Sequence, residues 1–435
     1  SGHFFFFFLN EIIALKSELK VLCYRSGDRI KLYQARVEND ELIVEDHEEG
    51  GIFEYNLSRS HTPVPERQAL QEALFHEKQT IIENCLFGVD INPNSVKICR
   101  LRLWIELLKN AYYQIPEQKT PTASGLELQT LPNIDINIKA GNSLVSRFPL
   151  DASLESALKQ SGWRIQDYKA FVKGYKHPKS KEDKISNLAV INEIKKAFST
   201  AITRNHPKQK QLDKMGKELY EKYTGERLFE EKITQKQKKD RERLEKRINK
   251  LQEEIDELKN SEIYRNAFEW RFEFPEVLDD EGNFKGFDVA IGNPPYIRQE
   301  QLKEIKPYLS QQYEVFKNTA DILVYFVELG LQVLKQQGVF SFIISNKFLR
   351  ATYGEKLRNW LKQYQVRKII DFGDLPVFEE ASTYPMILAI EKHAFTENFQ
   401  ALNAKTLDFD DLQNYVKNEG IKVSKNALTS KNWNL

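Results

Sequence analysis

The tetrapeptide Asn293-Pro294-Pro295-Tyr296 has residue types and spacing suited to chemistry on an exocyclic amino group. It directly follows FDVAIG, an apolar run that predicts a strand. Two prolines cannot continue a strand, because each lacks the N–H that a sheet ladder requires. We therefore expect the chain to leave a sheet in a stiff loop at the carboxyl end of this strand. That edge is where open α/β sheets bind their ligands.

The amino nitrogen of a planar base is a poor nucleophile, because its lone pair is delocalised into the ring. The side-chain oxygen of Asn293 and the backbone carbonyl of Pro294 could accept its two N–H bonds, which favours a pyramidal nitrogen that is ready for alkylation. Tyr296 would stack on the same base, a contact worth about 1–3 kcal/mol. Pro294 and Pro295 would hold the two side chains in fixed positions. The alternative is a structural turn with a buried tyrosine.

Polar residues also follow two strands predicted in the first third of the chain. Asp90 ends the run CLFGVD, and Asn92-Pro93 then supplies an N-cap and a first-turn proline for a helix. A carboxylate in this position can accept both hydroxyls of a ribose, although an Asp that caps the next helix is the alternative. Asn142 follows the strand predicted at 136–141, where an ordinary turn residue is the alternative.

The elements around these residues alternate between apolar strands and amphipathic helices, which predicts an α/β fold with a mostly parallel sheet. Helices are predicted at 4–22, 70–83, 93–107, 320–337 and 354–365, and strands at 85–90, 136–141, 287–291, 339–345, 367–372 and 385–390. The last two strands are expected to be adjacent and antiparallel, because only a loop joins them.

Two segments interrupt this alternation. Residues 24–60 predict a β-meander insertion with strands at 29–37, 41–45 and 52–56. Residues 151–275 predict a helical insertion with an a/d seam of two heptads, formed by Leu244, Ile248, Leu251, Ile255 and Leu258. Within it, residues 201–250 carry 16 Lys/Arg and 9 Asp/Glu. The interleaving of Lys and Glu favours a solvated helical surface, and tracking of a phosphate backbone is the alternative.

The run FDVAIGNPPYIR resembles the γ-class adenine-N6 DNA methyltransferases, especially the large type IIG restriction–modification enzymes. The resemblance covers most of residues 1–395 apart from the two insertions. It implies a Rossmann-like fold, S-adenosylmethionine as the cofactor, no metal, and transfer of a methyl group to adenine N6 of a base flipped out of double-stranded DNA. Catalysis then falls to Asn293, Pro294, Pro295 and Tyr296, and Tyr384 and Phe395 are candidates for a second stacking aromatic, with core or loop packing as their alternative.

The resemblance also implies the cofactor-binding residues and the domain plan. The cofactor would be held by Ser1, Gly2, Asp90, Ile91, Asn142 and Ser143, with Ser1-Gly2 as the second half of a glycine-rich loop that this chain enters midway. The first part of the methyltransferase domain would be 1–150, the helical insertion 151–275 and the catalytic part 276–395. Residues 396–435 would connect to a target-recognition domain that, like any nuclease domain, lies outside this chain.

Composition sets broader limits on the class of protein. The 435 residues exceed one ordinary core, and 41% hydrophobic and 29% charged residues are typical of a globular protein. No apolar run is long enough to span a bilayer, and three cysteines are too few for a disulfide framework, so we expect a cytoplasmic protein. Two alternatives stay open: the same fold acting on RNA or on protein glutamine, and an inactive remnant that binds DNA or acts as a scaffold.

Overall fold

The computed structural model describes residues 3–48, 50–59, 62–114, 127–129, 132–150, 159, 162–205, 207–224, 234–260, 262–378, 384–394, 398–429 and 431–433. The contacts among them divide the chain into two units. Unit 1 comprises Ser1–Ser143 and Gln166–Ala197, and unit 2 comprises Leu144–Ile165 and Phe198–Leu435.

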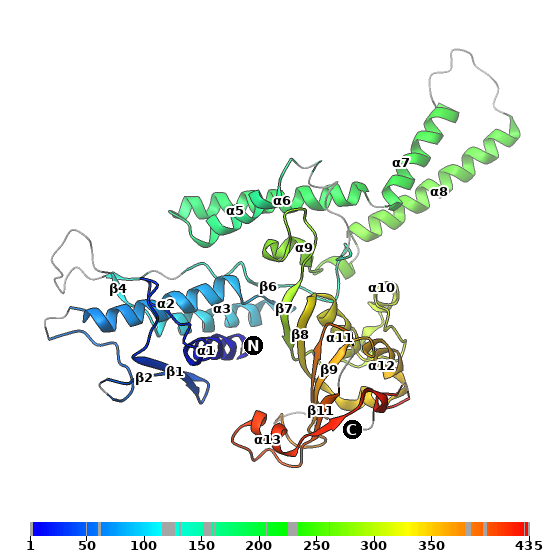
Figure 1. The fold of residues 1–435 in the computed structure, drawn as a ribbon. Coiled ribbons are helices and arrows are strands. Elements are labelled where there is room, and N and C mark those ends of the chain that lie inside the picture. Colours follow the sequence, from blue (N-terminus) through cyan, green and yellow to red (C-terminus); the bar gives the residue numbers. More distant parts are fainter. Residues whose placement is uncertain are drawn as a thin grey trace. The chain divides into compact units, whose positions relative to one another are not determined.

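Unit 1 is built from helices around short strands (Figure 1). Its elements are α1 (His3–Glu18), β1 (Tyr33–Glu38), β2 (Glu41–Asp46), α2 (Pro65–Asn84), β3 (Gly88–Asp90), α3 (Pro93–Leu108), β4 (Tyr113–Gln114), β5 (Glu127–Leu128), β6 (Ile138–Ala140), nearly all of α5 (Ile165–Lys176) and most of α6 (Lys181–Asn205). Buried residues of α1, α2 and α3, such as Leu9, Leu74 and Leu103, form its core. β3 and β6 pair in parallel.

The start of α3 agrees with the sequence signals. The side chain of Asn92 accepts a hydrogen bond from the backbone N–H of Asn94 at 2.9 Å, and Pro93 occupies the first turn. Along the helix, Val96, Cys99 and Leu103 are buried at helical spacing. The N-cap and the apolar stripe therefore determine where α3 begins and which side it buries.

Unit 2 contains a six-stranded sheet in the order β12-β11-β9-β10-β8-β7. The strands are β7 (Phe287–Gly292), β8 (Leu334–Ser345), β9 (Gln365–Asp371), β10 (Pro385–Glu391), β11 (Phe399–Asn403) and β12 (Ile421–Val423). The pairs β7–β8 and β9–β11 are parallel, whereas β10 is antiparallel to both β8 and β9, and β12 is antiparallel to β11. Four of the six strands thus point the same way, and the predicted antiparallel pairing of the strands at 367–372 and 385–390 is confirmed.

The helices of unit 2 and the last part of the chain complete this fold. The helices are α7 (Pro207–Leu219), α8 (Gln235–Asn260), α9 (Trp270–Glu273), α10 (Lys306–Gln312), α11 (Leu323–Gln332), α12 (Glu355–Leu361) and α13 (Leu412–Glu419). Buried Phe399, Ala401 and Trp433 join the same core as α11 and β8. Part of the segment at 396–435, which we expect to be a connection, therefore belongs to the sheet and its core.

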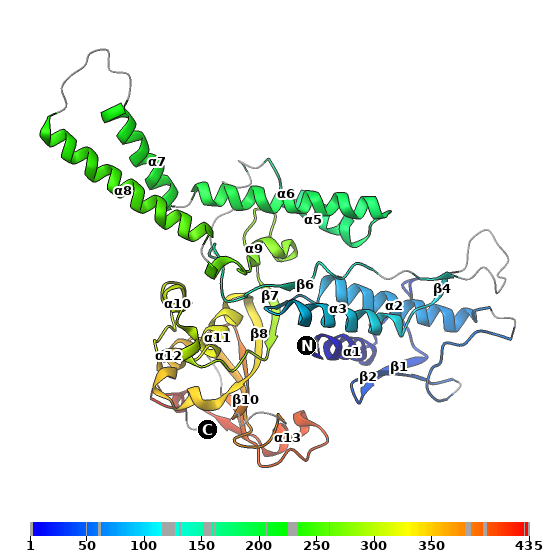
Figure 2. The same cartoon turned by 180° about the vertical axis from the view of Figure 1, so that it is seen from behind.

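The helices α7 and α8 lie side by side as a hairpin in both views (Figures 1 and 2). Among the predicted seam residues of α8, Ile255 is buried and Leu244, Ile248 and Leu251 are partly buried. The α7 side contributes the buried Met215. The predicted a/d seam therefore lies on a packed side of α8 in the described part of the chain.

Two predicted elements are shorter than expected. The strand at 52–56 is reduced to a single bridge between Ile52 and Glu45, flanked by hydrogen bonds from Phe53 N to Val44 O at 2.7 Å and from Asp46 N to Gly51 O at 2.9 Å. Beyond Phe53 the chain leaves β2, and the carbonyl of Glu54 accepts a hydrogen bond from Arg67 at 3.2 Å. The helix expected at 320–337 ends at Gln332, since residues from Leu334 onward pair with β7 as strand β8.

Candidate active site

The tetrapeptide Asn293-Pro294-Pro295-Tyr296 follows β7 at its carboxyl end, as the sequence predicts. Asn293 is exposed, Pro294 is buried, and the Tyr296 side chain is 40% exposed. Among the described residues, the Asn293 amide has no hydrogen-bond partner. The buried proline anchors the loop, and the amide next to it is left available for an external partner.

Packing on either side holds the loop in place. Gly292 lies opposite Phe342 of β8, and a Cβ on this glycine would approach the phenyl ring to 3.1 Å. After the tetrapeptide, the carbonyl of Ile297 accepts a hydrogen bond from Ile322 N at 3.2 Å, which connects the loop to the start of α11. Burial also raises the pKa of the Tyr296 hydroxyl, so this ring stays neutral.

Further polar groups lie at the same edge of the sheet. Asn346 follows β8 and donates a hydrogen bond from Nδ2 to Oδ1 of Asp371, the last residue of β9, at 2.8 Å. Tyr384 immediately precedes β10, whose first residue pairs with the last residue of β8. Tyr384 is 44% exposed, and Lys347 Nζ lies 5.4 Å from the centroid of its ring.

The tertiary structure therefore brings Tyr384 to the sheet edge from which the tetrapeptide emerges, with β8 between β7 and β10. Adjacent strands are about 4.8 Å apart, so β7 and β10 are separated by about 10 Å. Sequence reasoning did not select Asn346, Lys347 or Asp371. The available signal was that Asn346 and Lys347 directly follow the predicted strand VFSFIIS and that Asp371 lies near the end of the predicted strand RKIIDF.

Asp90 and Asn142 lie at the carboxyl ends of the parallel strands β3 and β6. Asp90 pairs with Ala140, and its backbone carbonyl accepts a hydrogen bond from Gly141 N at 2.9 Å. One side-chain oxygen of Asp90, Oδ1, accepts a hydrogen bond from Asn92 N at 2.8 Å. This bond closes the turn that leads into α3. The second oxygen has no hydrogen-bond partner among the described residues. The helix-capping alternative thus accounts for one oxygen and leaves the other available.

The remaining cofactor candidates are placed as follows. Ile91 is 64% exposed, and Asn142 and Ser143, which follow β6, are partly buried. Ser1, Gly2 and Phe395 lie outside the described residues. Asp90, Ile91, Asn142 and Ser143 belong to unit 1, whereas the tetrapeptide and Tyr384 belong to unit 2.

In the described part of the chain, His, Cys, Asp and Glu side chains form no group of three or more that could hold a metal ion.

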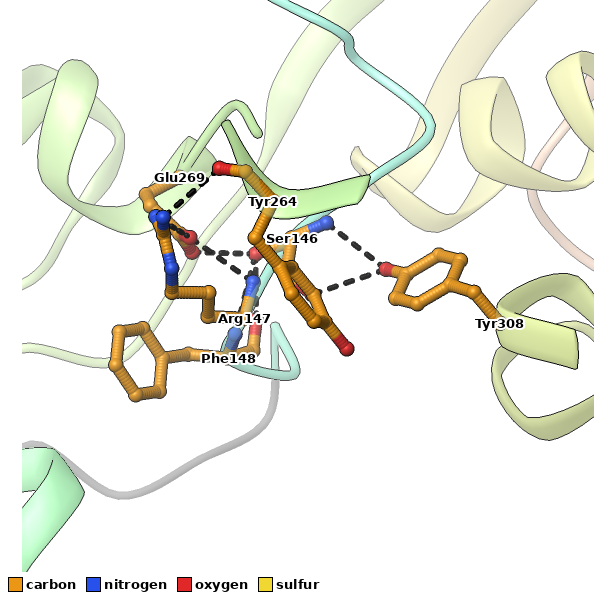
Figure 3. A network of polar contacts seen from close by, with 6 residues as sticks. All are labelled: Ser146, Arg147, Phe148, Tyr264, Glu269 and Tyr308. Atoms are coloured by element: carbon orange, nitrogen blue, oxygen red, sulfur yellow. Dashed lines mark hydrogen bonds and ion pairs between the residues drawn. The ribbon is translucent and has the colours of Figure 1, made fainter. Parts of the chain in front are cut away.

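Two tyrosines that follow the tetrapeptide in sequence, Tyr308 and Tyr313, form hydrogen bonds to the backbone of residues 144–146, just after Asn142. Tyr313 donates its hydroxyl hydrogen to the carbonyl of Leu144 at 2.8 Å. Tyr308 of α10 accepts from Ser146 N at 2.8 Å and donates to Ser146 O at 3.0 Å (Figure 3). Burial raises the pKa of both hydroxyls above the ordinary tyrosine value, so each retains its hydrogen.

Glu269 extends this network (Figure 3). Its carboxylate accepts from Ser146 Oγ at 2.6 Å and from Arg147 N at 2.9 Å, while Arg147 Nη2 donates to the carbonyl of Tyr264 at 2.8 Å. Burial raises the pKa of Glu269, and the hydrogen bonds it accepts oppose that shift. The network ties residues 146–148, before the helical insertion, to residues 264–269, near its end.

Comparison with known proteins places this chain in a family. Residues 84–378 match the family model of the Eco57I restriction-modification methylase, so the chain belongs to this family. It is 38% identical over 109 residues to the type II methyltransferase M.BstVI of Geobacillus stearothermophilus, which covers 24% of this chain and 19% of that protein. It is 31% identical over 124 residues to the type II restriction enzyme and methyltransferase RM.Eco57I of Escherichia coli, which covers 27% of this chain and 12% of that protein. Each match thus spans less than a fifth of the relative's length.

A solved structure described as a class I S-adenosylmethionine-dependent methyltransferase from Listeria monocytogenes is 14% identical and covers 67% of this chain and 98% of its own. Its TM-score of 0.25 is too low to carry an argument. Membership in a methylase family makes S-adenosylmethionine the cofactor and the α/β architecture a Rossmann-like methyltransferase fold. Among the described helices, none has both the length and the apolar composition of a membrane span.

Proposed function

We propose that this chain is the catalytic part of a site-specific DNA methyltransferase of a restriction–modification system, which acts on adenine N6. The observation that carries this proposal is the exposed Asn293 amide. It lies without a partner among the described residues, at the carboxyl end of β7, between a strand and a buried proline. An asparagine that merely shaped a turn would be expected to hydrogen-bond to its own loop.

In this mechanism the residues of the tetrapeptide bind and orient the base. Asn293 Oδ1 and the carbonyl of Pro294 accept the two N–H bonds of the amino group, so its lone pair is directed away from the ring. Tyr296 stacks on the base and replaces part of the stacking lost when the nucleotide leaves the duplex. S-adenosylmethionine supplies an electrophilic methyl group when bound. The cofactor would supply this methyl group with its C–S electron pair left on sulfur, and the amino nitrogen oriented by Asn293 and Pro294 would then release its surplus proton to solvent.

The cofactor would be held by residues of unit 1. The uncommitted oxygen of Asp90 is suited to accept a ribose hydroxyl, and Ile91, with 64% of its surface exposed, offers an apolar contact to an adenine ring. Asn142 and Ser143 follow the neighbouring parallel strand and would contact the same nucleoside. Ser1 and Gly2 are proposed to contribute backbone contacts.

The test is Asn293→Ala, with Asn359→Ala, an exposed asparagine on α12, as the matched control. Each variant is incubated with unmethylated duplex DNA and S-adenosylmethionine, and N6-methyladenosine is measured by mass spectrometry of the nucleosides. We expect Asn293→Ala to reduce the rate by at least about 100-fold, the size of effect seen when one preorganised hydrogen-bond partner of a transition state is removed. The control should match the wild type.

Parallel reactions with RNA and with protein distinguish the alternatives that the sequence leaves open. Methylated RNA or methylated glutamine, without methylated DNA, would overturn the choice of acceptor. Calorimetry with S-adenosylmethionine addresses the other alternative, an inactive remnant that acts as a scaffold, because such a remnant would fail to bind the cofactor. Equal rates for Asn293→Ala and the wild type would contradict the role assigned to the tetrapeptide.

A further inference from the structure

The first half of α8 carries cations that are segregated from its carboxylates. Residues 235–250 contain eight Lys/Arg and three Asp/Glu, whereas residues 251–260 contain one Lys and four Asp/Glu. The helix is therefore strongly basic over its first four turns and acidic over its last turns. An evenly solvated helix surface would not require this separation along its length.

Six of the eight cations form one stripe along the helix. Their spacings alternate between three and four residues, with one adjacent pair, and at 100° per residue this places them within an arc of about 100°. All six side chains are exposed: Lys236, Lys239, Arg243, Lys246, Arg247 and Lys250. We refer to these six residues as the basic stripe.

The packed side of the helix points elsewhere. Leu244, Ile248, Leu251 and Ile255 centre on a direction about 120° around the helix from the basic stripe, by the same geometry. Since these four are the partly or fully buried apolar residues in the described part of α8, the hairpin with α7 packs through the seam. The basic stripe is thus not needed to hold α7 against α8.

The carboxylates of this half do not neutralise the basic stripe. Glu242 and Glu245 lie outside its arc, and Asp240 lies beside its edge. Glu245 pairs with Arg241, a cation outside the stripe, at 2.7 Å. Within the described part of the chain, none of the six stripe side chains forms an ion pair or a hydrogen bond. Glu254, one turn beyond Lys250, falls within the same arc of the helix as the basic stripe, but it is paired with Lys208 of α7 at 2.8 Å.

We propose that the basic stripe binds the phosphate backbone of double-stranded DNA, as a contact separate from the base-binding tetrapeptide. From Lys236 to Lys250 the helix rises by about 21 Å, and one DNA strand places a phosphate about every 3.4 Å along its axis. Six cations therefore meet a comparable number of phosphates. Arg247 and Lys250 interact at longer range with Glu218 and Glu254, but none of the six cations has to give up an internal ion pair to replace the counterions of DNA. This inference goes beyond the proposed methyl transfer and does not depend on catalysis.

The experiment uses the whole chain and a fluorescently labelled 20-base-pair duplex, with anisotropy measured at several salt concentrations. The test variant is K239Q/R243Q/K246Q/R247Q. The control, K356Q/K405Q/K417Q/K422Q, removes the same number of charges from exposed lysines elsewhere in unit 2. Glutamine is a good helix former, so α8 should persist, which circular dichroism checks.

Each phosphate contact that is lost lowers the slope of log K against log salt by about 0.9, so the test variant should lose up to about 3–4 in slope. We expect at least a tenfold weaker affinity at low salt and no change in slope for the control. An unchanged slope in the test variant would overturn the proposal and leave the stripe as a solvated or protein-binding surface. Equal losses in both variants would also overturn it, since overall charge would then explain the binding.

Failure of this proposal can be distinguished from failure of the proposed function. Asn293→Ala should retain the full salt slope, because it leaves the basic stripe unchanged. If the chain binds duplex DNA through the stripe and yet transfers no methyl group to it, the interaction surface stands and the proposed activity fails.

Discussion

Lys78 on α2 offers a direct test of how burial affects the stability of unit 1. Only 2% of its side chain is exposed. Its ammonium donates to the carbonyl of Glu106 at 3.1 Å and lies 3.5 Å from the Glu106 carboxylate, which Lys109 also approaches to 2.8 Å. Burial lowers the pKa of Lys78 from 10.5 to about 8, and attraction to Glu106 opposes this only in part.

This pKa has a defined consequence for stability. Because the folded pKa lies below the unfolded value, the unfolded chain binds more protons between about pH 8 and 10.5, and the free energy of unfolding rises with pH in that window. A fall from 10.5 to about 8 corresponds to about 3 kcal/mol, since one pKa unit is about 1.4 kcal/mol. The stabilising contribution is present above the unfolded pKa and is lost as the pH falls through about 8.

The assay is chemical denaturation of the wild type and of Lys78→Met between pH 7.5 and 10.5. Subtracting the variant removes the titration of the groups that the two proteins share. We expect the difference in unfolding free energy, wild type minus variant, to rise by up to about 3 kcal/mol across this range. Lys97→Met, at an exposed lysine on α3, serves as the control and should show no such rise. Parallel curves for the wild type and Lys78→Met would refute the reasoning.

Two further predictions concern the candidate site. Tyr308→Phe removes two hydrogen bonds to the backbone of Ser146, so it should reduce the free energy of unfolding by about 1–3 kcal/mol in denaturation experiments. This is roughly twice the effect expected for Tyr313→Phe, which removes one hydrogen bond. Equal effects of the two variants would contradict this count. Tyr296→Ala should lower the efficiency of methylation by about 5- to 150-fold through lost stacking, while Tyr296→Phe keeps the ring and should stay near the wild type, measured as kcat/KM with duplex DNA. A loss in Tyr296→Phe as large as in Tyr296→Ala would indicate that the hydroxyl, not the ring, is required.

Several features of the candidate site were predictable because their signals are local. Two prolines after FDVAIG end a strand through their missing N–H groups, and the structure places the tetrapeptide directly after β7. Asn92-Pro93 predicts the start of α3, because an N-cap acts on N–H groups only two or three residues away. The seam of α8 follows from helical period alone.

Other features were missed because they depend on pairing between distant segments. The approach of Tyr384 to the edge that carries Asn293 requires the order β7-β8-β10, which no neighbouring residue specifies. The sequence at 396–435 looks polar and weakly patterned, yet Phe399 and Trp433 are buried in the core. Phe399 is buried because β11 pairs with β9, and Trp433 because it packs on Phe348. The start of β8 at Leu334 likewise depends on pairing with Phe287.

The sequence by itself determined which functional groups are present. They are an amide, two prolines and an aromatic ring at a strand end, an acid before a capped helix, and a helix rich in cations. The tertiary structure decided which of these groups remain available. Asn293 stays exposed while Pro294 is buried, one oxygen of Asp90 is used by its own turn, and the basic stripe of α8 stays exposed without an ion pair to any described residue. The physical reason is range, since caps, prolines and helical periods act over a few residues, whereas burial and strand order depend on contacts between parts of the chain that are far apart in sequence.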